Sequence, residues 1–154
     1  MIGILVIAHA PLASALAHSA AHVYECAPEL AANGLRVLDI APGTDVPATV
    51  AQARQIVAEL DYGSGVLVLT DAFGATPGNI AVQLNQPGKV AVVAGINLPM
   101  LLRVLCYREG TLAESAEKAV SGGTQGVLQV AATSVQNQIY QPQGHDLARL
   151  HDQQ

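Results

Sequence analysis

Two short stretches hold the residue types best suited to chemistry. The stretch "ILVIAHAP" (4–11) presents one histidine, His9, where a run of branched apolar residues ends, and "TDAFGATPGN" (70–79) presents Asp71 in the same position. A neutral imidazole is a nucleophile near pH 7. A carboxylate that accepts a hydrogen bond from one ring nitrogen fixes the tautomer and leaves the lone pair of the other nitrogen free. This pair favours nucleophilic chemistry at His9, with Asp71 orienting the ring.

The residues after Asp71 are suited to binding an anion. A helix is expected to begin there, and its first N–H groups and the positive end of its dipole attract negative charge. The backbone of Gly74, Ala75 and Thr76, together with the Thr76 hydroxyl, could donate to the oxygens of a phosphoryl group without any metal. Thr76 is also expected to cap that helix. The sequence thus predicts a phosphohistidine relay that needs no cofactor.

The elements that must position these residues alternate between strands and helices. The apolar runs expected to form buried strands are "IGILVIA" (2–8), "GLRVLDI" (34–40), "GVLVLTD" (65–71) and "KVAVVAGI" (89–96). The Ala-rich segments between and after them, which we expect to be helices, are 12–30, 47–60, 77–84, 99–107 and 112–120. This order predicts an α/β fold with a doubly wound, mostly parallel sheet.

The order of the strands decides whether the site can form. In an open α/β sheet, ligands bind outside the carboxyl ends of the strands, where His9, Asp39, Asp71 and Asn97 would lie. His9 can meet Asp71 only if the first and third strands are neighbours. The flavodoxin-like order 2-1-3-4-5 satisfies this requirement, and we expect it here.

The C-terminal part of the chain is expected to add one more strand and a tail. "SGG" (121–123) is predicted to interrupt the secondary structure after the last helix. "GVLQVAATS" (126–134) is predicted to form a fifth strand at the sheet edge. From residue 136 the composition turns to Gln, Asn, Pro and Gly. We therefore expect one domain over residues 1–135 and a polar tail over 136–154.

Composition excludes several classes of function. The 154 residues carry a formal charge of −5, and seven scattered basic residues make neither a nucleic-acid footprint nor a polybasic membrane patch. Every apolar run is too short to span a bilayer, and the first residues lack the features of a signal peptide. We expect a cytoplasmic protein with no nucleic-acid partner and no membrane insertion. Cys26 and Cys106 are expected to be reduced and buried.

Other residues in the sequence suggest other chemistries. His18 and His22 lie four residues apart, the spacing of two metal ligands on one helix face, but no third ligand accompanies them. An aspartyl-phosphate receiver would need an acidic pair after the first strand, where this chain has His9. A small tetrapyrrole metal chelatase, with His9 as a metal ligand, stays open as the alternative. A signalling module in which phosphorylation of His9 only changes partner affinity also stays open.

The motifs as a set resemble a known family. "VIAHAP", "VLTDAFGATPGN" and "VVAGINLPML" (92–101) are similar, in this order and at this spacing, to the mannose-type enzyme IIA component of the bacterial phosphoenolpyruvate:sugar phosphotransferase system. The resemblance covers residues 1–130. It implies that His9 is phosphorylated by the carrier protein HPr, that Asp71 bonds its ring, and that Thr76 stands where the family usually has a phosphoryl-contacting serine.

The resemblance also implies partners. It predicts a homodimer whose fifth strand, here 126–134, is exchanged between subunits, and a separate IIB protein as the next phosphoryl acceptor. The chain departs from the family where Gly-Gly-Ser-Pro-Phe-Asn is common, since residues 74–79 read Gly-Ala-Thr-Pro-Gly-Asn. The backbone N–H of Ala75 is kept, so a phosphate cradle is still expected.

Overall fold

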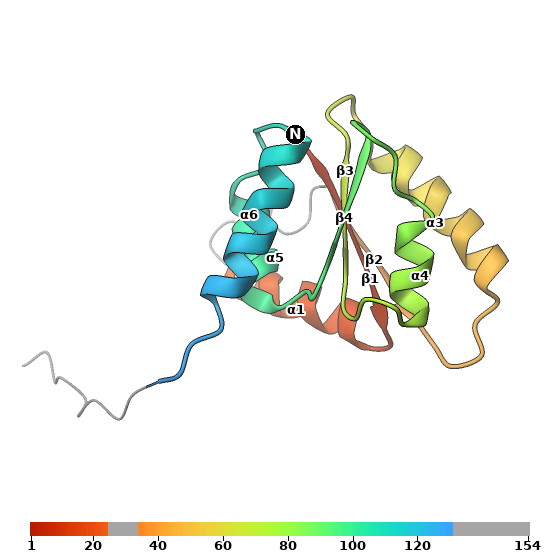
Figure 1. Ribbon diagram of the computed structural model, residues 1–154, viewed down its shortest axis with the longest axis horizontal. Coiled ribbons are helices and arrows are strands. Elements are labelled where there is room, and N and C mark those ends of the chain that lie inside the picture. The colour runs from red at the N-terminus through yellow and green to blue at the C-terminus, as the bar shows by residue number, and fades with distance from the viewer. Residues whose placement is uncertain (25–33, 131–154) are drawn as a thin grey trace, which may run out of the picture.

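A parallel sheet with helices on both faces forms the fold (Figure 1). The computed structural model describes residues 1–24 and 34–130. Within them, the strands are β1 (Gly3–His9), β2 (Leu35–Ile40), β3 (Val66–Thr70) and β4 (Val90–Ala94). The helices are α1 (Leu12–Val23), α3 (Val46–Leu60), α4 (Thr76–Val82), α5 (Leu98–Cys106) and α6 (Leu112–Gln125). The predicted α/β class with a parallel sheet is confirmed.

The strand order places β1 between β2 and β3. The four strands lie in the order β2-β1-β3-β4, and every neighbouring pair is parallel. Ile7 of β1 is in register with Thr70 of β3, and His9 is in register with Ile40 of β2. The carboxyl ends of β1 and β3 therefore lie side by side, as a contact between His9 and Asp71 requires.

Each face of the sheet has its own core, set by the alternation of side chains along the strands. Ile4, Val6 and Ala8 of β1 pack with residues of α1, α5 and α6, whereas Leu5 and Ile7 pack with residues of α3 and α4. Figure 1 shows the same division, with α1, α5 and α6 on one side of the sheet and α3 and α4 on the other. His9 continues the alternation of Leu5 and Ile7, toward the face that α3 and α4 cover.

The predicted break at 121–123 is wrong, because α6 runs through these residues to Gln125. Glycine weakens an isolated helix, but here it permits close contact with α5. A Cβ on Gly122 would lie 2.7 Å from the Cβ of Arg103, and one on Gly126, the C-cap of α6, would lie 2.3 Å from the Cβ of Pro99. Packing against α5 therefore needs glycine at both positions.

The predicted fifth strand does not begin where the sequence suggested. Gly126 caps α6, and residues 127–130 belong to no strand. Residues 131–134, the domain boundary expected after 135 and the polar tail lie outside the described residues, as does part of the first predicted helix, over 25–30. Among the described helices, none combines the length and apolar character that crossing a bilayer would need.

Candidate functional site

His9 ends β1 and is held from both neighbouring strands. Its backbone N–H donates to Asp71 Oδ2 at 2.9 Å on the β3 side, and the N–H of Ala10 donates to the carbonyl of Ile40 at 3.0 Å on the β2 side. The imidazole itself is 54% exposed. The backbone of the candidate nucleophile is therefore fixed, while its ring is open to an approaching molecule.

The ring of His9 is oriented by Asp71. Nδ1 of His9 lies 2.7 Å from Oδ2 of Asp71, across 62 positions in the sequence. The second carboxylate oxygen, Oδ1, accepts the N–H of Ala72 at 2.8 Å. An ionised carboxylate can only accept, so Nδ1 must carry the proton in this contact. In the neutral ring this leaves the lone pair on Nε2.

The surroundings of Asp71 favour its ionised form. Burial alone would raise the pKa of this carboxyl, but hydrogen bonds from the His9 backbone, the His9 ring and the Ala72 backbone lower the pKa below its ordinary value of 3.8. The side chain keeps 12% exposure. Asp71 is therefore a carboxylate at neutral pH, as its proposed orienting role requires.

A pocket of about 440 Å³ opens beside the ring of His9. Its walls are Ile40, residues 41–44 of the loop that joins β2 to α3, Val46 at the start of α3, and Thr76 at the start of α4. The loop turns at Gly43, whose φ of +77° favours glycine, and the Thr44 hydroxyl donates to the carbonyl of Ala41 at 2.7 Å. This pocket is larger than a phosphoryl group and leaves room for part of a partner molecule.

The expected phosphate cradle lies in the loop between β3 and α4. Gly74 turns this loop with a φ of +85°. The Ala75 N–H is directed to the carbonyl of Ala72 at 3.4 Å, whereas those of Gly74 and Thr76 have no acceptor in the described part of the chain. Two of the three predicted backbone donors are thus free.

Thr76 does not cap α4 as the sequence suggested. The N-cap is Ala75, which has no side-chain oxygen, and Thr76 is the first helical residue. The Thr-Pro pattern placed the N-cap of α4 one residue too late. Sequence patterns locate a helix end only to within one or two residues. The exposed Thr76 side chain lines the pocket beside His9 instead.

Asp39 has a structural role that the sequence did not reveal. Its Oδ1 accepts the N–H groups of Ala13 at 2.9 Å and Ser14 at 3.2 Å, so it caps α1 from the neighbouring strand β2. The N-cap of α1 is Pro11, which has no side-chain acceptor. That missing acceptor was the available signal, since the first N–H groups of a helix need partners. Asp39 thereby fixes the helix that follows His9.

The remaining candidates lie away from this pair. His18 and His22 are exposed on α1, and no three His, Cys, Asp or Glu side chains in residues 1–24 and 34–130 are grouped to hold a metal ion. Asn97 caps α5 by accepting the N–H of Met100 at 2.9 Å. Cys106 is exposed rather than buried as expected, and Cys26 lies outside the described residues.

Comparisons with known proteins agree with one another. The family model EIIA-man, described as the PTS system fructose IIA component, matches residues 3–121. The PTS system mannose-specific EIIAB component of Escherichia coli K12 is 31% identical over 102 residues, which are 64% of this chain and 32% of that protein. The PTS system fructose-specific EIIA component of Bacillus subtilis is 28% identical over 110 residues, which are 71% of this chain and 72% of that protein. This chain thus spans about a third of the EIIAB relatives it matches.

A solved structure shares the fold. The mannose/sorbose-specific IIA subunit from Enterococcus faecalis superposes with a TM-score of 0.74 at 22% identity, covering 87% of this chain and 98% of that one. At this level of identity the likeness concerns the fold alone.

Proposed function

The chain belongs to the EIIA-man family of phosphotransferase-system IIA components, as the resemblance predicted, and on this premise we propose that it is a cytoplasmic phosphocarrier. In this proposal His9 accepts a phosphoryl group from phospho-HPr and passes it to a separate IIB protein, for sugar uptake or for regulation. The observation that carries the proposal is the 2.7 Å contact between Nδ1 of His9 and Asp71, which leaves Nε2 free beside an open pocket.

The proposed transfer step makes use of this geometry. The lone pair of Nε2 attacks phosphorus, the bond from phosphorus to the donor breaks, and the donor leaves with the bonding electrons. The ring gains positive charge as the new bond forms, and the Asp71 carboxylate, still bound to the Nδ1 proton, stabilises that charge. The N–H groups of Gly74 and Thr76 and the Thr76 hydroxyl would donate to the phosphoryl oxygens. The reverse sequence delivers the group to the next acceptor.

Incubation with phosphoenolpyruvate, enzyme I and HPr tests the proposal. Intact mass spectrometry should show one phosphoryl group that is lost in acid, and the His9→Ala variant should show none. His18→Ala, which changes another exposed histidine, is the matched control and should be phosphorylated normally. A wild-type protein that gains no phosphoryl group, or a His9→Ala variant that still gains one, would disprove the proposal.

The alternative chelatase function has less support in the pocket. A metal site there would need further ligands close to His9. Among the residues that line the pocket beside His9, no other is a histidine, cysteine or carboxylate. We therefore retain the phosphocarrier proposal.

The proposed assembly is a homodimer in which the segment 126–134 pairs with β4 of a second copy. Two observations support it. β4 is the last strand of the described sheet and has one edge without a neighbouring strand, and the residues Val127, Leu128 and Val130 are 76%, 68% and 83% exposed. An open strand edge and an exposed apolar segment are complementary surfaces.

The oligomeric state tests this assembly. Light scattering should give a dimer for the wild type and a monomer for Leu128→Asp. Val23→Asp, which places the same charge at an exposed position on α1, should remain dimeric. A monomeric wild type, or a Leu128→Asp variant that stays dimeric, would contradict the proposed exchange.

A further inference from the structure

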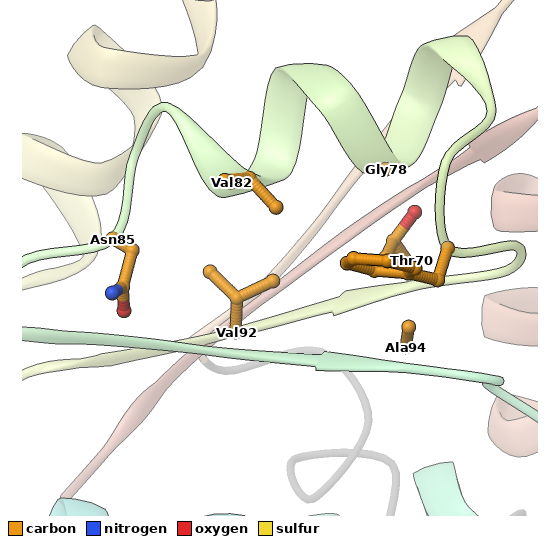
Figure 2. Close-up of a pocket in the computed structure, with 7 residues that line it drawn as sticks. Thr70, Gly78, Val82, Asn85, Val92 and Ala94 are labelled. Atoms are coloured by element: carbon orange, nitrogen blue, oxygen red, sulfur yellow. The ribbon is translucent and has the colours of Figure 1, made fainter.

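A second pocket, of about 220 Å³, lies between α4 and the strands β3 and β4 (Figure 2). Figure 2 shows Thr70, Val92 and Ala94 on the strands, with Gly78 and Val82 of α4 above them and Asn85 at one end. Phe73 completes the lining. The walls are mostly apolar, and none of the lining side chains is charged, so the pocket suits a neutral occupant.

Thr70 gives this pocket a polar anchor. The residue is 1% exposed, and its hydroxyl oxygen has no hydrogen-bond partner. In Figure 2 this oxygen points from the strand toward the first turn of α4, where Gly78 lies. A buried hydroxyl without a partner costs free energy, whereas one that binds an occupant does not. An apolar cavity with one convergent polar group is the usual form of a small-molecule site.

The walls of this pocket also shape the loop beside His9. Thr70 directly precedes Asp71, and Phe73, which is 84% exposed, belongs to the loop between β3 and α4. Gly78 packs so closely on this loop that a Cβ there would lie 2.5 Å from the carbonyl oxygen of Ala72. A molecule in the pocket would therefore lie against Thr70 and Phe73, which flank Asp71 and Ala72 in the sequence.

We propose that this pocket binds a small neutral molecule with a compact apolar body and one carbonyl or hydroxyl oxygen that accepts a hydrogen bond from Thr70. At about 30 Å³ for each water-sized unit, the volume corresponds to a ligand of roughly seven non-hydrogen atoms. This binding does not depend on the proposed function.

Cyclohexanone is a suitable probe, because it has seven non-hydrogen atoms and one carbonyl oxygen. Titrated into the full-length ¹⁵N-labelled protein, it should cause saturable shifts in the amide signals of residues 70–82 and 90–94. Methylenecyclohexane has nearly the same shape without the oxygen and should bind about threefold to tenfold more weakly, the range for one neutral hydrogen bond.

Two variants make the binding test specific. Thr70→Val keeps the shape of the side chain without the hydroxyl and should weaken cyclohexanone binding by about threefold to tenfold. Ala94→Leu should fill the pocket and abolish binding. Thr124→Val, on α6 at the other face of the sheet, is the matched control and should bind normally. The proposal would be overturned if cyclohexanone caused no saturable shifts. Equal binding by wild type, Thr70→Val and Ala94→Leu would also overturn it. So would the finding that another segment of protein fills the pocket.

A protein that binds cyclohexanone but accepts no phosphoryl group would refute the proposed function and leave the binding site standing.

Discussion

Replacing Asp71 with asparagine tests the pair at the centre of the proposed transfer. In the wild type, Oδ2 accepts both the backbone N–H and the ring Nδ1 proton of His9, and Oδ1 accepts the N–H of Ala72. An amide has one acceptor and one donor, so in either orientation an NH₂ group faces at least one N–H. If the NH₂ group faces the ring, Nδ1 must act as the acceptor, and the proton moves to Nε2, the atom that should attack.

The expected loss of rate follows from these contacts. A hydrogen bond to a charged group contributes about 1.5–3 kcal/mol, and about 1.4 kcal/mol corresponds to a tenfold change in rate. Losing the carboxylate that stabilises the charged ring should therefore slow phosphoryl acceptance by about 10-fold to 150-fold. A ring trapped as the wrong tautomer would slow it further.

Rapid-quench measurement of phosphoryl acceptance from phospho-HPr gives this rate directly. Asp45→Asn is the matched control, because Asp45 caps α3 by accepting the N–H of Ala48 at 3.0 Å, and asparagine caps a helix equally well. The control should accept the group at nearly the wild-type rate. An Asp71→Asn variant within twofold of wild type, with its fold intact by circular dichroism, would remove Asp71 from the mechanism.

Capping, helix packing and acid titration provide three more tests. Asp39→Ala should lower the free energy of unfolding by about 1–2 kcal/mol, because α1 loses its acceptor, while Asp39→Asn should keep most of it. Equal urea midpoints for these two variants would contradict the capping role. Gly122→Ala should cost about 1–3 kcal/mol, since its Cβ would meet the Cβ of Arg103 at 2.7 Å, and an unchanged melting temperature would refute that packing. The pKa of Asp71 is lowered in the fold, so its carboxylate stabilises the protein above the ordinary pKa of 3.8, and this contribution is lost as the pH falls through the lower, folded pKa. The stability difference between wild type and Asp71→Asn should therefore shrink as the pH falls below about 4, and a difference that persists undiminished in acid would contradict this.

The sequence could predict the layers of the fold because buried parallel strands must be apolar on both faces. Such runs stand out when Ala-rich helices separate them. Ligands bind outside the carboxyl ends of parallel strands, and this rule linked His9 with Asp71. The 62 positions between the two residues did not matter, because the order of the strands alone brings them together.

The sequence could not predict features that depend on contacts between residues far apart in the chain. The glycines at 122 and 123 signal a break by propensity, and only the packing of α6 against α5 explains why the helix continues. The cap of α1 comes from Asp39, on a strand 25 or more positions away. The unpaired hydroxyl of Thr70 likewise depends on which groups surround it in the fold.

The fixed ring of His9 has a kinetic consequence for the proposed carrier. Asp71 occupies Nδ1, so one nitrogen must both receive the phosphoryl group and release it. The donor protein and the acceptor protein then have to visit the same atom in turn, and no productive ternary complex can form. Turnover would follow a double-displacement scheme, in which an excess of either partner slows the cycle by occupying the ring that the other needs.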